Sequence, residues 1–259
     1  MDRRRALQLL AGAGLVTIAA ACTSKSKSES SATSGTSATT SSTNSSTSST
    51  GSNTVTEIAE ETAGPYPADG SNGPNVLAES DVVRSDIRSS IGSLSGTAEG
   101  VPLTIALTVL DLDNGASALA SAAVYVWHCD RETNYSLYSD TSQNYLRGVQ
   151  VTDDEGKVTF TSIFPGCYSG RWPHIHFEVY ESLDAAKNGG TKLKTSQLAF
   201  PEDACNTAYA SDGYDSSVNN LSQISLETDN VFSDGWSTEL ATVTGSVTDG
   251  YTATLNVAV

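Results

Sequence analysis

Two histidines stand one residue apart in the stretch "GCYSGRWPHIHFEVY", residues 166–180, although the whole chain has only three histidines. Read as a β-strand, "HIHFEVY" places His174 and His176 on one face, because side chains two residues apart point to the same side. Two imidazoles at that spacing can hold one metal ion. The same spacing also suits an ordinary pair of surface or core histidines, so the neighbouring residues decide between the two interpretations.

Tyr168 lies six residues before His174, after a Pro-Gly turn that can fold it over the same face, and Arg171 lies three residues before His174. A tyrosine binds metal as the phenolate, and its free pKa is near 10. A trivalent cation lowers that pKa strongly, so tyrosine with histidine indicates ferric iron rather than zinc, calcium or magnesium. Zinc would more often take Cys, a carboxylate or a third histidine. We predict that the third histidine, His128, is structural.

Four stretches in order along the chain resemble one enzyme family. They are "GPYP" (64–67), "VYVWHCDRETNYSLYSD" (124–140), "YLRGVQVTDDEGKVTF" (145–160) and "FPGCYSGRWPHIHFEVY" (164–180). Together they are similar to the intradiol ring-cleavage dioxygenases, the family of catechol 1,2-dioxygenase and protocatechuate 3,4-dioxygenase. The resemblance runs from about residue 61 to about residue 205. It implies a β-sandwich that binds non-haem Fe(III).

The resemblance also implies which residues hold the metal. The family uses two tyrosines and two histidines, and three of these ligands correspond to Tyr168, His174 and His176. The other tyrosine corresponds to Tyr135, with Tyr138 as the alternative. Tyr168 resembles the tyrosine that leaves the metal when substrate binds and accepts a proton, so the resemblance makes it catalytic as well.

Four residues around the substrate follow from the same resemblance. Arg171 matches the arginine that stabilises negative charge on the substrate ring, and Pro65 and Tyr66 match the segment beside the substrate. Gln197 in "TSQLAF" resembles a polar residue near the site, although an exposed strand position explains it nearly as well. We therefore expect catalytic work from Arg171 and Tyr168, and substrate binding by Pro65, Tyr66, Arg171 and Gln197.

The implied reaction cleaves a catechol-type ring between its two hydroxylated carbons with O2 and gives a cis,cis-muconate-type diacid. Only five residues separate Tyr168 from His174, fewer than in the better-known enzymes, and no long N-terminal helical region is evident. Neither the particular catechol nor the oligomeric state is therefore predicted. The alternative from another class is a tethered, non-catalytic β-sandwich binding protein at the cell surface, and a weaker one is a zinc metallohydrolase.

The sequence predicts an all-β fold, a β-sandwich with short helices. Short runs rich in Val, Ile, Thr and aromatic residues, separated by turn-forming clusters, are typical of strands in such a fold. These runs are residues 103–113, 122–130, 157–164, 174–180 and 252–259. Only residues 79–90 and 181–188 have the pattern of brief helices.

The N-terminal part of the chain predicts export. Three arginines precede an apolar run in residues 1–21, which indicates a signal peptide of the twin-arginine kind. Cys22 follows three alanines and resembles a lipobox cysteine, so we predict its lipidation, with simple cleavage after Ala21 as the alternative. The protein is then a cell-surface lipoprotein or is secreted.

Residues 22–55 form the predicted linker to the folded domain, residues 56–259. Of the 32 residues from Thr23 to Thr54, 23 are Ser or Thr. A segment of this composition cannot bury enough apolar surface to offset its ordering entropy, so we predict a disordered tether. The domain itself carries nine Lys or Arg and 28 Asp or Glu, a formal net charge of −19. That charge argues against nucleic acid as a partner, and against membrane contact other than through the lipid.

The domain has three cysteines, and an exported protein can form disulfides. Cys167 and Cys205 both lie in loop-like sequence, so we predict that they pair. Cys129 lies in an apolar, strand-like run and is predicted to be a buried thiol.

Overall fold

The computed structural model describes residues 55–259, which all belong to one compact unit. The predicted export signal, Cys22 and, apart from Val55, the predicted tether lie outside the described residues. Within the described part of the chain, no helix combines the length and the apolar character that a membrane span requires.

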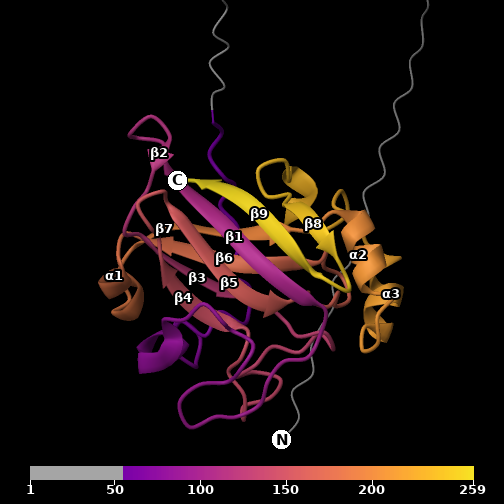
Figure 1. Ribbon diagram of the computed structural model, residues 1–259. Coiled ribbons are helices and arrows are strands. Elements are labelled where there is room, and N and C mark those ends of the chain that lie inside the picture. The colour runs from indigo at the N-terminus through magenta and orange to yellow at the C-terminus, as the bar shows by residue number, and fades with distance from the viewer. Residues whose placement is uncertain (1–54) are drawn as a thin grey trace, which may run out of the picture. The chain divides into compact units, whose positions relative to one another are not determined.

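Two β-sheets make up most of the fold (Figure 1). The first contains β1 (Pro102–Asp111), β2 (Ser117–Ala118), β5 (Lys157–Ile163), β8 (Thr242–Ser246) and β9 (Gly250–Ala258). Strand β1 is its centre, because it pairs in parallel with β9 on one side and antiparallel with β5 and β2 on the other. Strand β8 pairs antiparallel with β9.

The second sheet carries the histidines. Its strands are β4 (Arg147–Val151), β3 (Ala123–Trp127), β6 (His174–Tyr180) and β7 (Lys192–Ala199), in that order and all antiparallel. In this register His176 lies between Trp127 on β3 and Gln197 on β7.

The main hydrophobic core lies between the two sheets. Alternate residues of β1 enter it, and so do Ile175, Phe177 and Val179 of β6. A second apolar cluster covers the other face of the second sheet, where Trp127 packs with residues such as Leu77 and Tyr135. Both faces of β6 are therefore buried, one in the core and one beneath the covering segments.

Helices are few and short, as the sequence predicts, so the described residues form a mostly β fold consistent with an all-β sandwich. They are α1 (Leu183–Lys187), α2 (Glu202–Ala208), α3 (Asp215–Leu221) and the 3-10 turns η1 (Val76–Ala78), η2 (Ser80–Val82) and η3 (Phe232–Asp234). Helices α2 and α3 lie beside β8, and α1 lies at the opposite edge (Figure 1).

One of the two predicted helices is wrong. Residues 181–188 contain α1 as expected, but only the 3-10 turn η2 is helical within residues 79–90. The rest is extended, because this segment bridges β4 through Val83 and β5 through Asp86, and so links the edges of the two sheets. These long-range pairings override the local pattern.

The predicted Cys167–Cys205 disulfide is also wrong, since all three cysteines of the described chain are free and buried. Cys205 lies on the buried side of α2 rather than in a loop. The Cys167 thiol lies 3.5 Å from the carbonyl oxygen of Arg171, and burial raises its pKa to about 12. Cys129 is a buried thiol, as predicted.

Candidate metal centre

The two histidines of β6 point their outer nitrogens at each other. The Nε2 atoms of His174 and His176 lie 3.1 Å apart, so at most one proton fits between them. His174 Nδ1 lies 2.5 Å from the carbonyl oxygen of Trp172, which makes Nδ1 the donor and leaves Nε2 with a free lone pair. The ring of His176 stacks on Trp127, with centroids 4.9 Å apart. Both imidazoles are thus oriented by contacts behind them.

Two tyrosines complete the group. The Tyr168 hydroxyl lies 3.2 Å from His174 Nε2. The ring of Tyr135 lies 6.0 Å from the Tyr168 ring and 6.3 Å from the His176 ring, between centroids. The Tyr135 hydroxyl is buried without a hydrogen-bond partner among the described residues. An orphaned buried hydroxyl is costly, and a bound cation would satisfy it once the proton has left.

The charges of these four groups fit ferric iron. Burial lowers the pKa of His174 and of His176 well below the ordinary value, and Arg171 lowers both further, so both rings offer neutral lone pairs at pH 7. Burial raises the pKa of Tyr168 to about 12 and holds that of Tyr135 well above its ordinary value. A trivalent cation would reverse that preference. Two phenolates would then offset two of its three charges.

The alternative residues are used elsewhere. Tyr138 accepts a hydrogen bond from the Ala68 amide at 2.9 Å and donates to Asn72 Oδ1 at 2.7 Å. His128 is buried, with Nδ1 2.7 Å from the Cys129 carbonyl and Nε2 2.7 Å from Ser162 Oγ. Both contacts support a structural role for His128, and the structure brings Tyr135 rather than Tyr138 to the histidines.

Arg171 is fixed beside the tyrosines by two partners. Its Nε donates to Asp229 Oδ2 at 2.9 Å, and its Nη2 donates to Gln197 Oε1 at 2.6 Å. The Gln197 side chain is fully buried and donates in turn to the Thr62 carbonyl at 2.9 Å, so it is not an exposed strand residue. Gln197 therefore lies behind Arg171 and does not line the cavity described next.

A cavity of about 590 Å³ opens over the tyrosines. Pro65, Tyr66, Tyr135, Tyr168 and Arg171 line it, together with hydroxyl and amide side chains. Arg171 is the only charged residue in its lining. The cavity is therefore an aromatic pocket with a single cation, which suits a flat, electron-rich ring.

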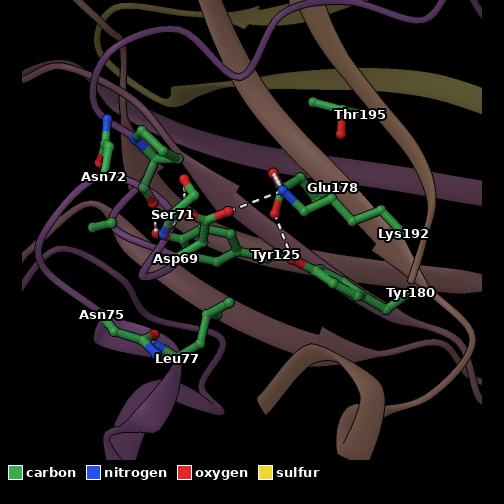
Figure 2. A network of polar contacts seen from close by, with 12 residues as sticks. Asp69, Ser71, Asn72, Asn75, Leu77, Tyr125, Glu178, Tyr180, Lys192 and Thr195 are labelled. Atoms are coloured by element: carbon green, nitrogen blue, oxygen red, sulfur yellow. Dashed lines mark hydrogen bonds and ion pairs between the residues drawn. The ribbon is translucent and has the colours of Figure 1, made fainter. Parts of the chain in front are cut away.

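Gly64 allows this pocket wall to approach the histidines. Its φ of +67° favours glycine, and a Cβ there would lie 3.3 Å from His176 Cε1. The chain that follows this pocket wall is held at Asp69 by a network of polar contacts (Figure 2). Lys192 donates to Asp69 Oδ2 at 2.9 Å and to Glu178 Oε1 at 2.5 Å, and Glu178 Oε2 accepts from Tyr180 at 2.6 Å. This network ties the segment after the pocket wall to β6 and β7.

Sequence reasoning missed two residues that hold the site. Trp127 stacks on the His176 ring, but within its sequence motif nothing marked it as a residue of the site. Asp229 lies beyond the stretch that resembles the family, and its carboxylate accepts from Arg171, from the Trp172 amide at 2.6 Å and from the Val231 amide at 2.8 Å. No local pattern in "ETDNVFSDG" distinguishes this aspartate from its acidic neighbours.

Comparisons with known proteins agree with this geometry. A family model described as Dioxygenase matches residues 72–221. A solved intradiol ring-cleavage dioxygenase from Tetranychus urticae is 25% identical, with 79% of this chain and 94% of that chain covered and a TM-score of 0.63. The dioxygenase domain of a dioxygenase carbohydrate-binding protein fusion from the cellulolytic bacterium Streptomyces sp. SirexAA-E is 22% identical, with 79% and 98% covered and a TM-score of 0.50.

The chain is therefore an oxidoreductase rather than a binding module. It belongs to the intradiol ring-cleavage dioxygenase family, whose members cleave catechol-type rings and generally use non-haem Fe(III). The likeness to the Streptomyces domain supports the fold alone.

Carboxyl groups gather near Arg171. The Glu239 side chain is fully buried, and neither of its oxygens has a hydrogen-bond partner among the described residues. Burial raises the pKa of Glu239 to about 8, with further contributions from Glu61 and Asp234, opposed by Arg171 and reinforced by Asp229. Burial likewise raises the pKa of Glu61 to about 7. Glu239 is thus mostly protonated in the folded chain at pH 7.

We expect Glu239→Gln to change how stability depends on pH. A carboxyl whose pKa rises from 4.5 to about 8 on folding binds its proton more tightly when folded, so its stabilisation is complete below pH 4.5 and is lost as the pH rises towards 8. Between these values the wild type should lose up to about 1.4 kcal/mol of unfolding free energy per pH unit more than the variant. Urea unfolding of both proteins at pH 5, 6, 7 and 8, which lie roughly between the two pKa values, measures this difference in unfolding free energy. Parallel pH profiles would show that Glu239 is ionised in the folded state.

Proposed function

We propose that the protein is a non-haem Fe(III) dioxygenase that cleaves a catechol-type ring between its two hydroxylated carbons. Both atoms of O2 enter the product, a cis,cis-muconate-type diacid. One observation carries the proposal: the Tyr168 hydroxyl and the Tyr135 ring lie beside the paired imidazoles of His174 and His176, and the Tyr135 hydroxyl has no hydrogen-bond partner among the described residues. Family membership supports the reaction class.

The four residues that would hold the iron are Tyr135, Tyr168, His174 and His176. Bound Fe(III) would supply Lewis-acid activation of the catechol toward O2. Tyr168 lines the pocket and is less buried than Tyr135, so it is the better placed of the two to take a proton from a catechol hydroxyl. Tyr135, deeper in the second apolar cluster, would remain in place.

Arg171 would supply positive charge where the ring becomes electron-rich. Its guanidinium is held by Asp229 and Gln197, so it needs no reorganisation when charge develops. Tyr66 and Pro65 would form the wall against which the ring lies. The buried rings of Trp127 and Tyr135 keep water from the far side of the site.

We also propose that the enzyme is exported and anchored by a lipid on Cys22. The support is the sequence alone: the arginines before the apolar run, the three alanines before Cys22 and the Ser/Thr-rich stretch that follows. Such a stretch would hold the catalytic domain away from the membrane surface.

The products of an aerobic reaction with catechol test the proposed function. With isotopically labelled O2, we expect cis,cis-muconate with one labelled oxygen in each carboxyl group, identified by mass spectrometry. A ring opened beside the hydroxylated carbons, giving a semialdehyde, would contradict intradiol cleavage. Catechol left unchanged by protein of verified iron content would contradict the substrate class.

Matched tyrosine variants test the ligand set. Tyr135→Phe should weaken ferric iron binding by more than the roughly 10–100-fold typical of losing an outer-shell partner, and should change the visible tyrosinate band. Tyr138→Phe removes a hydroxyl from the same loop but should retain both iron and colour, because that hydroxyl is bound to Ala68 and Asn72. Iron loss in Tyr138→Phe with none in Tyr135→Phe would reverse the assignment.

Arg171→Ala should keep its iron and lose about 10²–10³ in kcat, the usual cost of removing one preorganised charge from a site. Arg131→Ala is the control, because Arg131 pairs with Glu99 and Glu132 and does not line the pocket. Iron content and steady-state oxygen uptake measure the two effects. An iron-free Arg171→Ala protein would indicate that the arginine acts structurally, through Asp229.

A further inference from the structure

Arg147, the first residue of β4, is positively charged and fully buried. No sequence motif gives it a role. All five hydrogen bonds from its guanidinium reach neutral oxygens. Burying a charge without a carboxylate partner costs free energy, so the hydrogen bonds of Arg147 must offset that cost. The position of those oxygens indicates what the contacts achieve.

The guanidinium joins two segments that are far apart in the sequence. On one side Nη1 donates to the Tyr66 carbonyl at 2.9 Å and to the Pro67 carbonyl at 3.2 Å. On the other side Nη2 donates to the Ser136 carbonyl at 2.9 Å and Nε donates to Ser136 Oγ at 3.1 Å. One planar group therefore connects the pocket wall to the residue after Tyr135.

These two segments contribute adjoining rings to the lining of the pocket. The rings of Tyr66 and Tyr135 lie 4.8 Å apart, between centroids. Both rings line the cavity. Whatever fixes the Tyr66 backbone relative to the Ser136 backbone therefore fixes how the Tyr66 ring packs against a proposed metal ligand.

We propose that Arg147 is a positioning residue that fastens residues 64–67 to the loop bearing Tyr135, and so sets how the adjoining Tyr66 and Tyr135 rings face the catechol ring. The proposal rests on the proposed function for its effect on substrate, but not for its effect on the chain. Arginine suits this task because its rigid fork directs donors to both segments at once, whereas a lysine ammonium is a single point.

The neighbouring residues have anchors of their own. Lys192 holds Asp69 to Glu178 (Figure 2). The Tyr125 hydroxyl, by contrast, belongs to the Arg147 fastening, because it accepts from Arg147 Nη1 at 3.2 Å and donates to the Pro67 carbonyl at 2.7 Å. Weakening Arg147 should therefore loosen residues 64–67 and the Tyr135 loop without detaching the chain from residue 69 onward. That local pattern distinguishes positioning from general stabilisation.

The test compares Arg147→Lys with Arg84→Lys. Arg84 is a half-buried arginine that donates to the carbonyl oxygens of Arg147 and Ser89 and reaches neither pocket segment. Amide hydrogen exchange should rise at least about ten-fold in peptides covering residues 62–68 and 133–140 of Arg147→Lys, and not in β1 or β9. Arg84→Lys should leave those two peptides unchanged. Exchange needs neither iron nor turnover.

Anaerobic titration of the iron-loaded proteins with catechol gives the second readout. Arg147→Lys should raise the Kd at least about ten-fold while iron content stays at the wild-type level, whereas Arg84→Lys should bind like the wild type. Unchanged exchange and unchanged Kd in folded Arg147→Lys would overturn the proposal. So would an equal rise in exchange throughout the domain.

If Arg147→Lys does not fold, Tyr125→Phe decides. It removes the hydroxyl that Arg147 contacts at 3.2 Å and that bonds to Pro67. Faster exchange confined to residues 62–68 supports the proposal, and no change overturns it. A wild type that fails to bind catechol would defeat the proposed function while leaving the exchange result standing.

Discussion

The two-residue repeat of β6 is the constraint on which the rest of the site depends. Ile175, Phe177 and Val179 enter the core between the sheets, and this burial forces His174 and His176 onto the opposite face. A slip of one residue would move both histidines into the apolar core. The energy that holds the fold together thus also fixes the face proposed to bind metal, and the covering segments supply only the remaining donors.

Burial beneath those covering segments sets the charge states of the side chains in the site. The two imidazoles are kept neutral by burial, and the two phenols keep their protons until a cation arrives. Arg171 adds positive charge at the pocket, where it is balanced by Asp229. The proposed site would therefore favour an ion of high charge, since only a strong Lewis acid can deprotonate two buried tyrosines. Trp127 and the Trp172 carbonyl supply the contacts that orient the two imidazoles.

The sequence was informative where chemistry and local pattern coincide. The strands around residues 103–113 and 174–180, and the proximity of Tyr168 to His174, could be anticipated, because alternation and a Pro-Gly turn are local signals. The extended path of residues 79–90 could not, because it depends on pairing with two distant strands. Near the site, the roles of Asp229 and Arg147 could not be predicted for the same reason. Each acts through backbone atoms of remote segments, which no short motif encodes.

In the proposed site two tyrosines and two histidines hold ferric iron with room for a catechol. The most direct measurement is the visible absorption spectrum of residues 55–259, purified and loaded with ferric iron, before and after anaerobic addition of catechol. We predict a tyrosinate charge-transfer band that shifts to longer wavelength when catechol binds. A protein that stays colourless with ferric iron present would contradict the account.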